Sequence, residues 1–291
     1  MFNKQYSWFI AGLTFAVFWA SASTATKIGL MVAQPMVIAT VRFALAALIM
    51  LFFSHVLQKN RMPRGKEWVQ VAIYGALNIS IYLGLYIVAM QEVTAGIGAL
   101  SVAINPVLIS FFSVFFLNKK LTPSLVLALI VCTAGVVIAA WPLFAIAEVT
   151  TWGLSILFIS MLSYTAAAIY FSSKTWVGLS LVTINGWQTA IGGLLLLPFV
   201  IWHYKDDQNT FNFTFWSSVL WLAIPVSIGA VQLWLWLLKT NPMRAGLWLF
   251  LCPLFGFIIA ALLAGEKISV YTLVGVILVL LGLFFAKRLN K

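Results

Sequence analysis

The feature that most constrains the fold of this chain is its small number of charged residues, which lie mainly between ten long apolar stretches. Of the 291 residues, 8% are charged and 63% are hydrophobic, and the mean hydropathy is +1.07. A soluble domain carries about 25% charged residues, whereas a membrane-spanning helix needs about 20 mainly apolar ones. We therefore predict an all-α membrane protein embedded in a lipid bilayer, and exclude soluble enzymes and nucleic-acid binders. The predicted spans are residues 8–28, 34–54, 67–88, 94–117, 123–142, 152–172, 180–202, 215–237, 244–264 and 270–287.

The basic residues indicate the side of the membrane on which each loop lies, because loops rich in Lys and Arg stay in the cytoplasm. With the N-terminus inside, 13 of the 17 Lys and Arg residues lie in cytoplasmic segments, and five of the six acidic residues lie outside. The reverse orientation would put those 13 residues on the wrong side. We expect a multi-pass protein of a bacterial inner membrane with both termini cytoplasmic. The net charge of +11 then reflects topology and predicts no nucleic-acid partner.

An internal repeat relates residues 1–147 to residues 148–291. A shift of 147 positions aligns Lys27 with Lys174, Pro106 with Pro253, Lys120 with Lys267, and Gly135 with Gly282. Equivalent positions are five spans apart, and because five is odd the two halves must be inverted in the membrane. Inverted repeats are typical of secondary transporters. Pro106 and Pro253, near the centres of spans four and nine, are candidate hinges, with a purely structural kink as the alternative.

The two halves contain several motifs that point to one family. The first half contains Phe18-Trp19-Ala20-Ser21, Pro35, Arg42-Phe43 and Asn105-Pro106, and the second contains Pro253 and Ala264-Gly265-Glu266-Lys267. By these motifs the chain resembles the EamA-type members of the drug/metabolite transporter superfamily over nearly its whole length. One departure is Lys119-Lys120, where that family usually has Glu-Arg. The resemblance implies ten helices in two inverted five-helix repeats, and relatives that export amino acids or move sugars, nucleotide sugars or drugs.

Charges inside a bilayer are costly and mark candidate functional sites. Arg42 lies about 10 Å into span two, at 1.5 Å per residue. It is a candidate to bind a substrate carboxylate or phosphate, or to pair with helix-end carbonyls or with Glu92. Lys27 is a second candidate that could instead reach the headgroups.

The groups that are missing also bear on mechanism. No Asp or Glu lies in the middle of a predicted span, so proton-for-cation exchange lacks its central group. No GxxxxGK[ST] phosphate-binding loop is present either. Cys132 and Cys252 lie in apolar runs and predict buried thiols without a metal. We expect a facilitator or an exchanger that is not an enzyme and needs no metal or cofactor.

Polar and aromatic side chains at helical spacing predict the wall of a central cavity. Tyr74, Asn78 and Tyr82 share one face of span three, and Asn185 and Gln188 lie on one face of span seven. Buried amides need hydrogen-bond partners, which a ligand can supply, although bonds between helices are the alternative. The candidate substrate-binding residues are Trp19, Arg42, Tyr74, Asn78, Tyr82, Asn105, Tyr164, Trp187, Gln188, Gln232, Trp236 and Trp248.

Small residues in spans five and ten permit close packing of two helices. These residues are Ala128, Gly135, Gly275 and Gly282. They favour packing within the chain, with a dimer seam as the alternative, so a monomer or a homodimer is expected.

Three functional hypotheses follow from these features. The first is export of a small-molecule substrate, an amino acid or a related compound, by alternating access. The second is transport of an anionic metabolite such as a nucleotide, sugar phosphate or nucleotide sugar, which predicts several basic groups in the cavity. The third is a membrane scaffold without transport, which predicts appended soluble domains or long loops. The sequence favours the first.

Overall fold

The computed structural model describes residues 4–146, 150–264 and 269–288, and all regular elements within these ranges are helices. The first half makes five passes: α1 (Lys4–Leu30); α2 (Pro35–Leu51) with a π-helical extension (Phe52–Leu57); α3 (Lys66–Gly75), a π-helical segment (Ala76–Leu83) and α4 (Gly84–Glu92); α5 (Ala95–Ser101), a 3₁₀ turn (Val102–Ile104) and α6 (Asn105–Leu117); and α7 (Pro123–Ile146). The second half makes five more: α8 (Thr151–Ser173); α9 (Leu181–His203); α10 (Phe213–Trp221), a π-helical segment (Leu222–Ala230) and α11 (Val231–Thr240); α12 (Pro242–Leu247), a 3₁₀ turn (Trp248–Phe250) and α13 (Leu251–Ala264); and α14 (Val270–Arg288).

These passes agree with the predicted spans. By length and composition, eight of them can cross a membrane, and apolar helices at 123–139 and 270–285 are shorter within the part of the chain described. The all-α membrane architecture predicted from the sequence is therefore confirmed.

Local residues determine where the helices begin and end. Thr150, Ser180, Asn212 and Asn241 each accept, through the side-chain oxygen, a hydrogen bond from the backbone N–H three residues later. Such caps satisfy donors that the first turn of a helix leaves without a partner. Asn118 ends α6 in the left-handed conformation, with φ of 50°, which Asn tolerates better than most residues.

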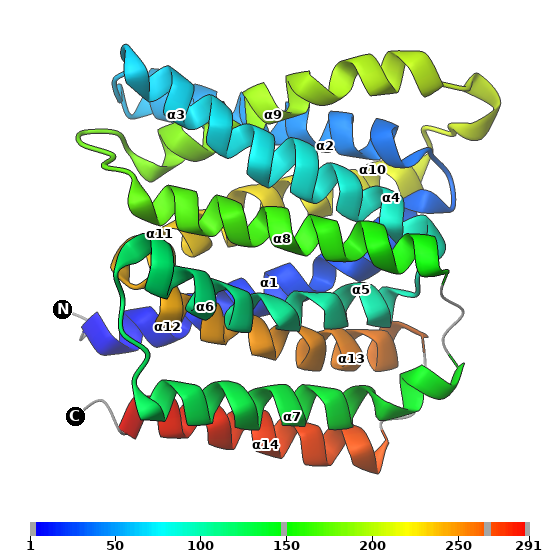
Figure 1. The fold of residues 1–291 in the computed structure, drawn as a ribbon. Coiled ribbons are helices and arrows are strands. Elements are labelled where there is room, and N and C mark those ends of the chain that lie inside the picture. Colours follow the sequence, from blue (N-terminus) through cyan, green and yellow to red (C-terminus); the bar gives the residue numbers. More distant parts are fainter. Residues whose placement is uncertain (1–3, 147–149, 265–268, 289–291) are drawn as a thin grey trace.

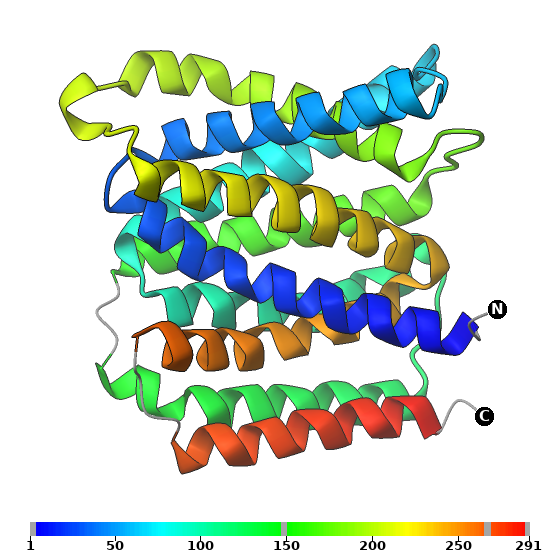
Figure 2. The same cartoon turned by 180° about the vertical axis from the view of Figure 1, so that it is seen from behind.

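The two halves run in opposite directions. In Figure 1, α1 starts on the side of the bundle where α14 ends, whereas α8 starts on the other side. We call these the terminal side and the opposite side. α1 packs against α13 and the segment Leu222–Ala230, and the equivalent helix α8 packs against α6 and the segment Ala76–Leu83. Figure 2 shows α1, in blue, between the yellow α10 and the orange α13. Each half therefore inserts its first helix into the other half.

The outermost pair, α7 and α14, packs with close backbone contact. Gly275 lies against the carbonyl oxygen of Gly135, and a Cβ at Gly282 would overlap the sulfur of Cys132. The thiol of Cys132 donates a hydrogen bond to the carbonyl of Val279, its equivalent 147 residues later, at 3.5 Å. The small residues of spans five and ten thus pack helix on helix within one chain. The oligomeric state stays a prediction.

Irregular backbone recurs at equivalent places in both halves. The π-helical segments Ala76–Leu83 and Leu222–Ala230 overlap when shifted by 147 residues, and so do the two 3₁₀ turns. Pro106 and Pro253 lie in the first turn of α6 and α13, the helices that follow these 3₁₀ turns. Proline lacks a backbone N–H, and π-helical turns often occur at functional sites. Four passes are therefore interrupted around the centre of the bundle, while any hinge motion at the two prolines stays a prediction.

Candidate functional site

A small, partly enclosed cavity lies between helices of the two halves, toward the opposite side of the bundle. Its volume is about 20 Å³, which has room for about one water molecule. The cavity is lined by Trp19, Ala20, Ala22, Ser23, Thr26, Arg42, Tyr82, Leu83, Tyr86, Ala99, Val102, Val226 and Cys252. A metabolite is larger than this space.

Arg42 on α2 is the cation of this cavity. Its side chain is 2% exposed, and its Nε donates a hydrogen bond to the Oγ of Ser227 at 2.8 Å. The guanidinium carbon lies 5.2 Å from the centroid of the Phe43 ring. The other edge is different, because Nη2 is buried and has no hydrogen-bond partner. Buried polar groups in proteins are nearly always paired, so this nitrogen can still donate to a ligand.

Thr26 on α1 has the same property. Its hydroxyl is buried without a hydrogen-bond partner, and the residue lines the same cavity as Arg42. Ser23 also lines the cavity, but its hydroxyl donates to the carbonyl of Ala20 at 3.1 Å. Two unpaired polar groups from two helices therefore face one small space.

A chain of buried hydrogen bonds ties Arg42 to the rest of the bundle. The Ser227 carbonyl accepts from the side-chain amide of Asn185 at 3.0 Å, and the Asn185 oxygen accepts from Gln188 at 2.9 Å. The Gln188 oxygen in turn accepts from Asn78 at 3.1 Å. The chain crosses four passes and both halves. It fixes the backbone of the π-helical segment that holds Ser227, and so fixes the hydroxyl that positions Arg42.

An aromatic column forms one wall beside the cavity. Trp19 stacks near Tyr82 with ring centroids 6.4 Å apart, and Tyr82 lies 4.7 Å from Tyr164. Trp234 stacks on Tyr164 at 5.5 Å and on Phe15 at 5.1 Å. The residues of the column come from α1, α8 and two further passes. It gives the site an apolar, water-excluding wall next to a cation.

The chemistry of this site suits a carboxylate. Arg has a planar fork of N–H donors that matches a carboxylate. The acidic residues within the described ranges are Glu67, Glu92, Asp206 and Asp207, and all four lie at helix ends or in loops. Glu92 accepts a hydrogen bond from Thr150 at 2.9 Å, so the pairing of Arg42 with Glu92, one of the alternatives from the sequence, is not what the structure shows. Among the described residues no group of His, Cys, Asp and Glu could hold a metal ion.

The structure brings together half of the residues proposed from the sequence. Trp19, Arg42 and Tyr82 line the cavity, and Tyr164 packs against two of them. Asn78 and Gln188 belong to the buried hydrogen-bond chain.

The other six candidates lie elsewhere. Their places are as follows: Tyr74 packs against Phe171 and Trp176; Asn105 bonds to Thr165 and Met161 on α8; Trp187 donates to His55 near the terminal side; Trp248 packs on Trp8 and Phe9; Gln232 is half-buried; and Trp236 is 37% exposed. None of these six lines the cavity.

Several residues of the site were not predicted from the sequence. Tyr86 continues the spacing of Asn78 and Tyr82 by one further step of four, so this signal was present. Ser23 and Thr26 follow Trp19 at four and seven residues, again on one helical face. Ser227 carried no comparable signal, because it lies in an apolar π-helical segment whose side-chain directions differ from those of an α-helix.

An interleaved helical bundle with inverted halves and a small cavity between them is the architecture typical of secondary membrane transporters. The sequence matches the EamA-like transporter family twice, at residues 6–141 and 142–287. The chain therefore belongs to the EamA-like transporter family.

Individual relatives agree with this assignment. An uncharacterized transporter of Archaeoglobus fulgidus is 25% identical over 284 residues, 97% of this chain and 98% of its own. Protein PecM of Dickeya dadantii is 25% identical and covers 88% of this chain and 84% of its own. The uncharacterized inner membrane transporter YedA of Escherichia coli is 26% identical, over 89% and 84% of the two chains. A solved crystal structure aligns over 98% of this chain and 99% of its own with a TM-score of 0.79 at 16% identity, which shows a shared fold.

Proposed function

We propose that this transporter moves small metabolites that carry a carboxylate, amino acids or related compounds, outward across a bacterial inner membrane by alternating access. The observation that carries the proposal is Arg42, a buried cation that lines the cavity and whose Nη2 lacks a hydrogen-bond partner. Because an unpaired buried charge is costly, a group that satisfies it during the transport cycle is a direct reason for its presence.

The position of the cavity along the passes supports this role. Among the lining residues, Val226 and Cys252 are near the middle of their passes, whereas Thr26, Tyr86 and Ala99 lie within about two helical turns of the opposite-side ends of theirs. Transporters built from inverted repeats bind substrate near the bilayer midplane, between the repeats and at interrupted helices. The interrupted backbone around this cavity follows that rule.

A first set of contacts closes the terminal side, and we call it the terminal-side latch. Arg61 forms an ion pair with Glu67 at 2.7 Å and also donates to the carbonyl of Val177 at 2.6 Å. Asn60 donates to the hydroxyl of Ser180 at 3.1 Å. This latch therefore joins the loop after α2 to the loop between α8 and α9.

A second set, the opposite-side latch, closes the other end. Gln34 accepts from the backbone N–H of Lys205 and from the side chain of Asn209, both at 2.8 Å, and donates to the carbonyl of His203 at 2.9 Å. It joins the loop between α1 and α2 to the loop after α9. These are the loops equivalent to those of the terminal-side latch, with the halves exchanged. Because equivalent loops form a latch on each of the two faces, we propose a cycle in which one latch opens while the other stays closed.

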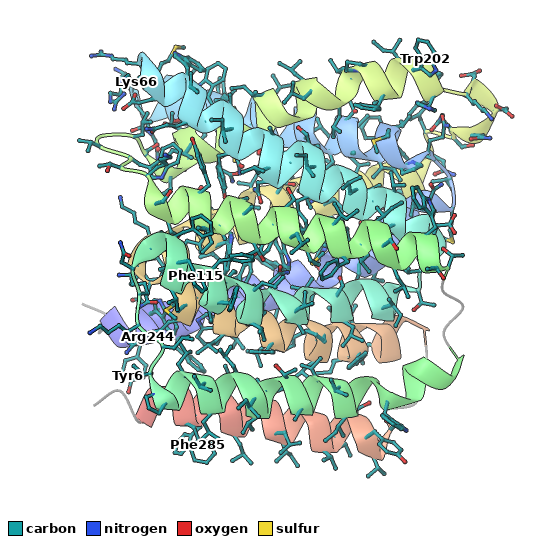
Figure 3. All side chains as sticks on the ribbon, viewed as in Figure 1. Tyr6, Lys66, Phe115, Trp202, Arg244 and Phe285 are labelled. Carbon is teal, nitrogen blue, oxygen red and sulfur yellow. The ribbon has the colours of Figure 1, made fainter. Side chains whose placement is uncertain are left out.

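Charge supports the orientation that makes this movement an export. In Figure 3, Lys66 and Arg244 lie at the same end of the bundle as Tyr6, and Trp202 lies at the other end. Asp206 and Asp207 lie in the loop after Trp202. Because basic loops stay in the cytoplasm, we assign the terminal side to the cytoplasm. The name of YedA as an inner membrane transporter supports the same membrane for this chain.

Among the alternatives, a nucleotide or sugar phosphate fits this cavity less well. Such substrates carry two or more negative charges, and Arg42 is the one basic residue among those that line the cavity. A non-transporting scaffold is not supported by the transporter family to which the chain belongs.

Counterflow in proteoliposomes tests the proposal. Vesicles preloaded with an unlabelled amino acid are expected to accumulate the same labelled amino acid, with or without a pH gradient. Arg42→Gln removes the charged donor and is expected to raise the half-saturation concentration about 10- to 100-fold. Lys239→Gln on the terminal side is the control for loss of one positive charge. If no amino acid or related carboxylate shows counterflow with correctly folded protein, the proposal is wrong.

A further inference from the structure

We infer that the Arg42 cavity recognises its substrate through the carboxylate alone, so that singly charged organic acids without an α-ammonium group are bound more tightly than the corresponding amino acids. This inference rests on the proposed function and narrows its substrate class. The chemistry concerned is that of a small monocarboxylate anion, such as a 2-oxo acid or an N-acylated amino acid.

The charge balance of the cavity favours a monocarboxylate. Arg42 contributes a positive charge, and the residues that line the cavity include no Asp or Glu. Within the described ranges, Glu67 is engaged by Arg61 and Glu92 by Thr150, and neither of these carboxylates lines the cavity. A monocarboxylate therefore neutralises the site. An amino acid, being a zwitterion, leaves its net charge at +1.

The hydrogen-bonding groups of the cavity also favour a carboxylate. The two unpaired groups are Arg42 Nη2, which is a donor, and the Thr26 hydroxyl, which can donate as well as accept. Both can serve the two oxygens of one carboxylate. An ammonium group needs acceptors, and the backbone carbonyls of helical passes are already used within the helices. The hydroxyl and ring groups left to it lie beside the cationic Arg42.

Arg42 is also held in place by hydrogen bonds. Its Nε is bonded to Ser227, whose carbonyl is in turn held by Asn185 at 3.0 Å. The guanidinium therefore presents a fixed edge and does not swing away to make room for a second positive charge. We assign Ser227 as the residue that positions Arg42 for the carboxylate.

Matched pairs of substrates test the inference. Uptake into proteoliposomes is measured for labelled L-alanine against pyruvate, and for L-leucine against 4-methyl-2-oxopentanoate and N-acetyl-L-leucine, at pH 7.5, with protein-free vesicles as background. We expect the acids to have half-saturation concentrations at least about tenfold lower than their amino acids, because no ammonium group is buried. Transport of the amino acids without transport of the acids overturns the inference and leaves the proposed function standing. Transport of neither class overturns both.

The role of Ser227 is tested in the same assay. Ser227→Ala is expected to raise the half-saturation concentration for the acids severalfold and to leave the maximal rate unchanged. Ser80 is its equivalent in the other half and bonds to the carbonyl of Gly192, away from Arg42, so Ser80→Ala is the matched control and should behave like the parent protein. A fall in maximal rate at constant half-saturation would show that Ser227 does not position the binding group.

Discussion

Arg42 shows how one residue separates stability from function in this protein. Its guanidinium is almost fully buried, is paired through one edge only, and has no carboxylate beside it among the described residues. Burying a charge without a counter-charge destabilises a fold, and replacing buried charged groups by apolar ones of similar size is often neutral or stabilising. An arginine would therefore be a poor choice for a position that serves packing alone.

We therefore predict that Arg42→Met leaves the thermal stability of the protein in detergent unchanged or higher, while transport of carboxylates is lost. The remaining Ser227 hydroxyl can bond to a carbonyl of the preceding turn, as mid-helix serines do, so it is not stranded. Thermal unfolding monitored by circular dichroism, together with counterflow, checks both halves of the prediction. A clear fall in the unfolding midpoint would mean that Arg42 is mainly a structural residue.

At the scale of the helices, the packing of α1 against the other half holds the bundle together. α1 is inserted between passes of the other half, and at Gly12 an added Cβ would overlap the ring of Trp248. Trp248 also packs on Trp8 with centroids 5.2 Å apart. The absence of a side chain at Gly12 thus allows the first helix to lie against the 3₁₀ turn that precedes α13.

We predict that Gly12→Ala destabilises the protein by about 1–3 kcal/mol, because a filled core accepts added volume only by displacing side chains. Gly229→Ala is the matched control, since its added Cβ would meet Phe18 at 3.5 Å, an ordinary contact distance. Chemical denaturation in detergent micelles should show a loss for the first variant and little change for the second. Equal behaviour of the two variants would contradict the close packing of α1 on Trp248.

The helices also show how far the sequence predicts this fold. The ten passes, their inversion and the irregular turns before Pro106 and Pro253 follow from apolar length, from the repeat and from proline chemistry. The faces of the passes do not follow, because in a membrane both lipid-facing and core-facing positions are apolar. Trp234 is 1% exposed and joins the aromatic column, while Trp236, chosen from the sequence by its spacing from Gln232, is 37% exposed. Amides were no surer a guide than rings, since Asn78 and Gln188 joined the buried hydrogen-bond chain, whereas Asn105 bonds to α8 and the Gln232 oxygen has no partner.

At the scale of the whole molecule, the inverted repeat places equivalent latches on two faces of one bundle. Gln34 closes the opposite side through His203, Lys205 and Asn209, and Arg61 with Asn60 closes the terminal side. The two halves exchange roles between the two faces. A cycle that opens each latch in turn needs no additional domain, only rocking of interleaved halves around the cavity.

We predict that locking either latch stops transport. In a background without Cys132 and Cys252, the pair Gln34→Cys with Asn209→Cys bridges one latch, and Asn60→Cys with Ser180→Cys bridges the other. Cross-linking either pair with a short bifunctional thiol reagent is expected to abolish counterflow, because each face must open once per cycle. The single-cysteine variants treated in the same way are the controls. Full counterflow with one latch locked would rule out alternating access through that face.

The most direct test of the Arg42 cavity as the substrate site uses its own thiol. Cys252 lines the cavity and is fully buried, so its alkylation by N-ethylmaleimide in a Cys132→Ala background reports how often the cavity is open and unoccupied. We predict that pyruvate and 4-methyl-2-oxopentanoate slow this alkylation, that the corresponding uncharged amides do not, and that Arg42→Gln removes the protection. Alkylation of Cys252 at an unchanged rate in the presence of a carboxylate that the protein transports would contradict the account.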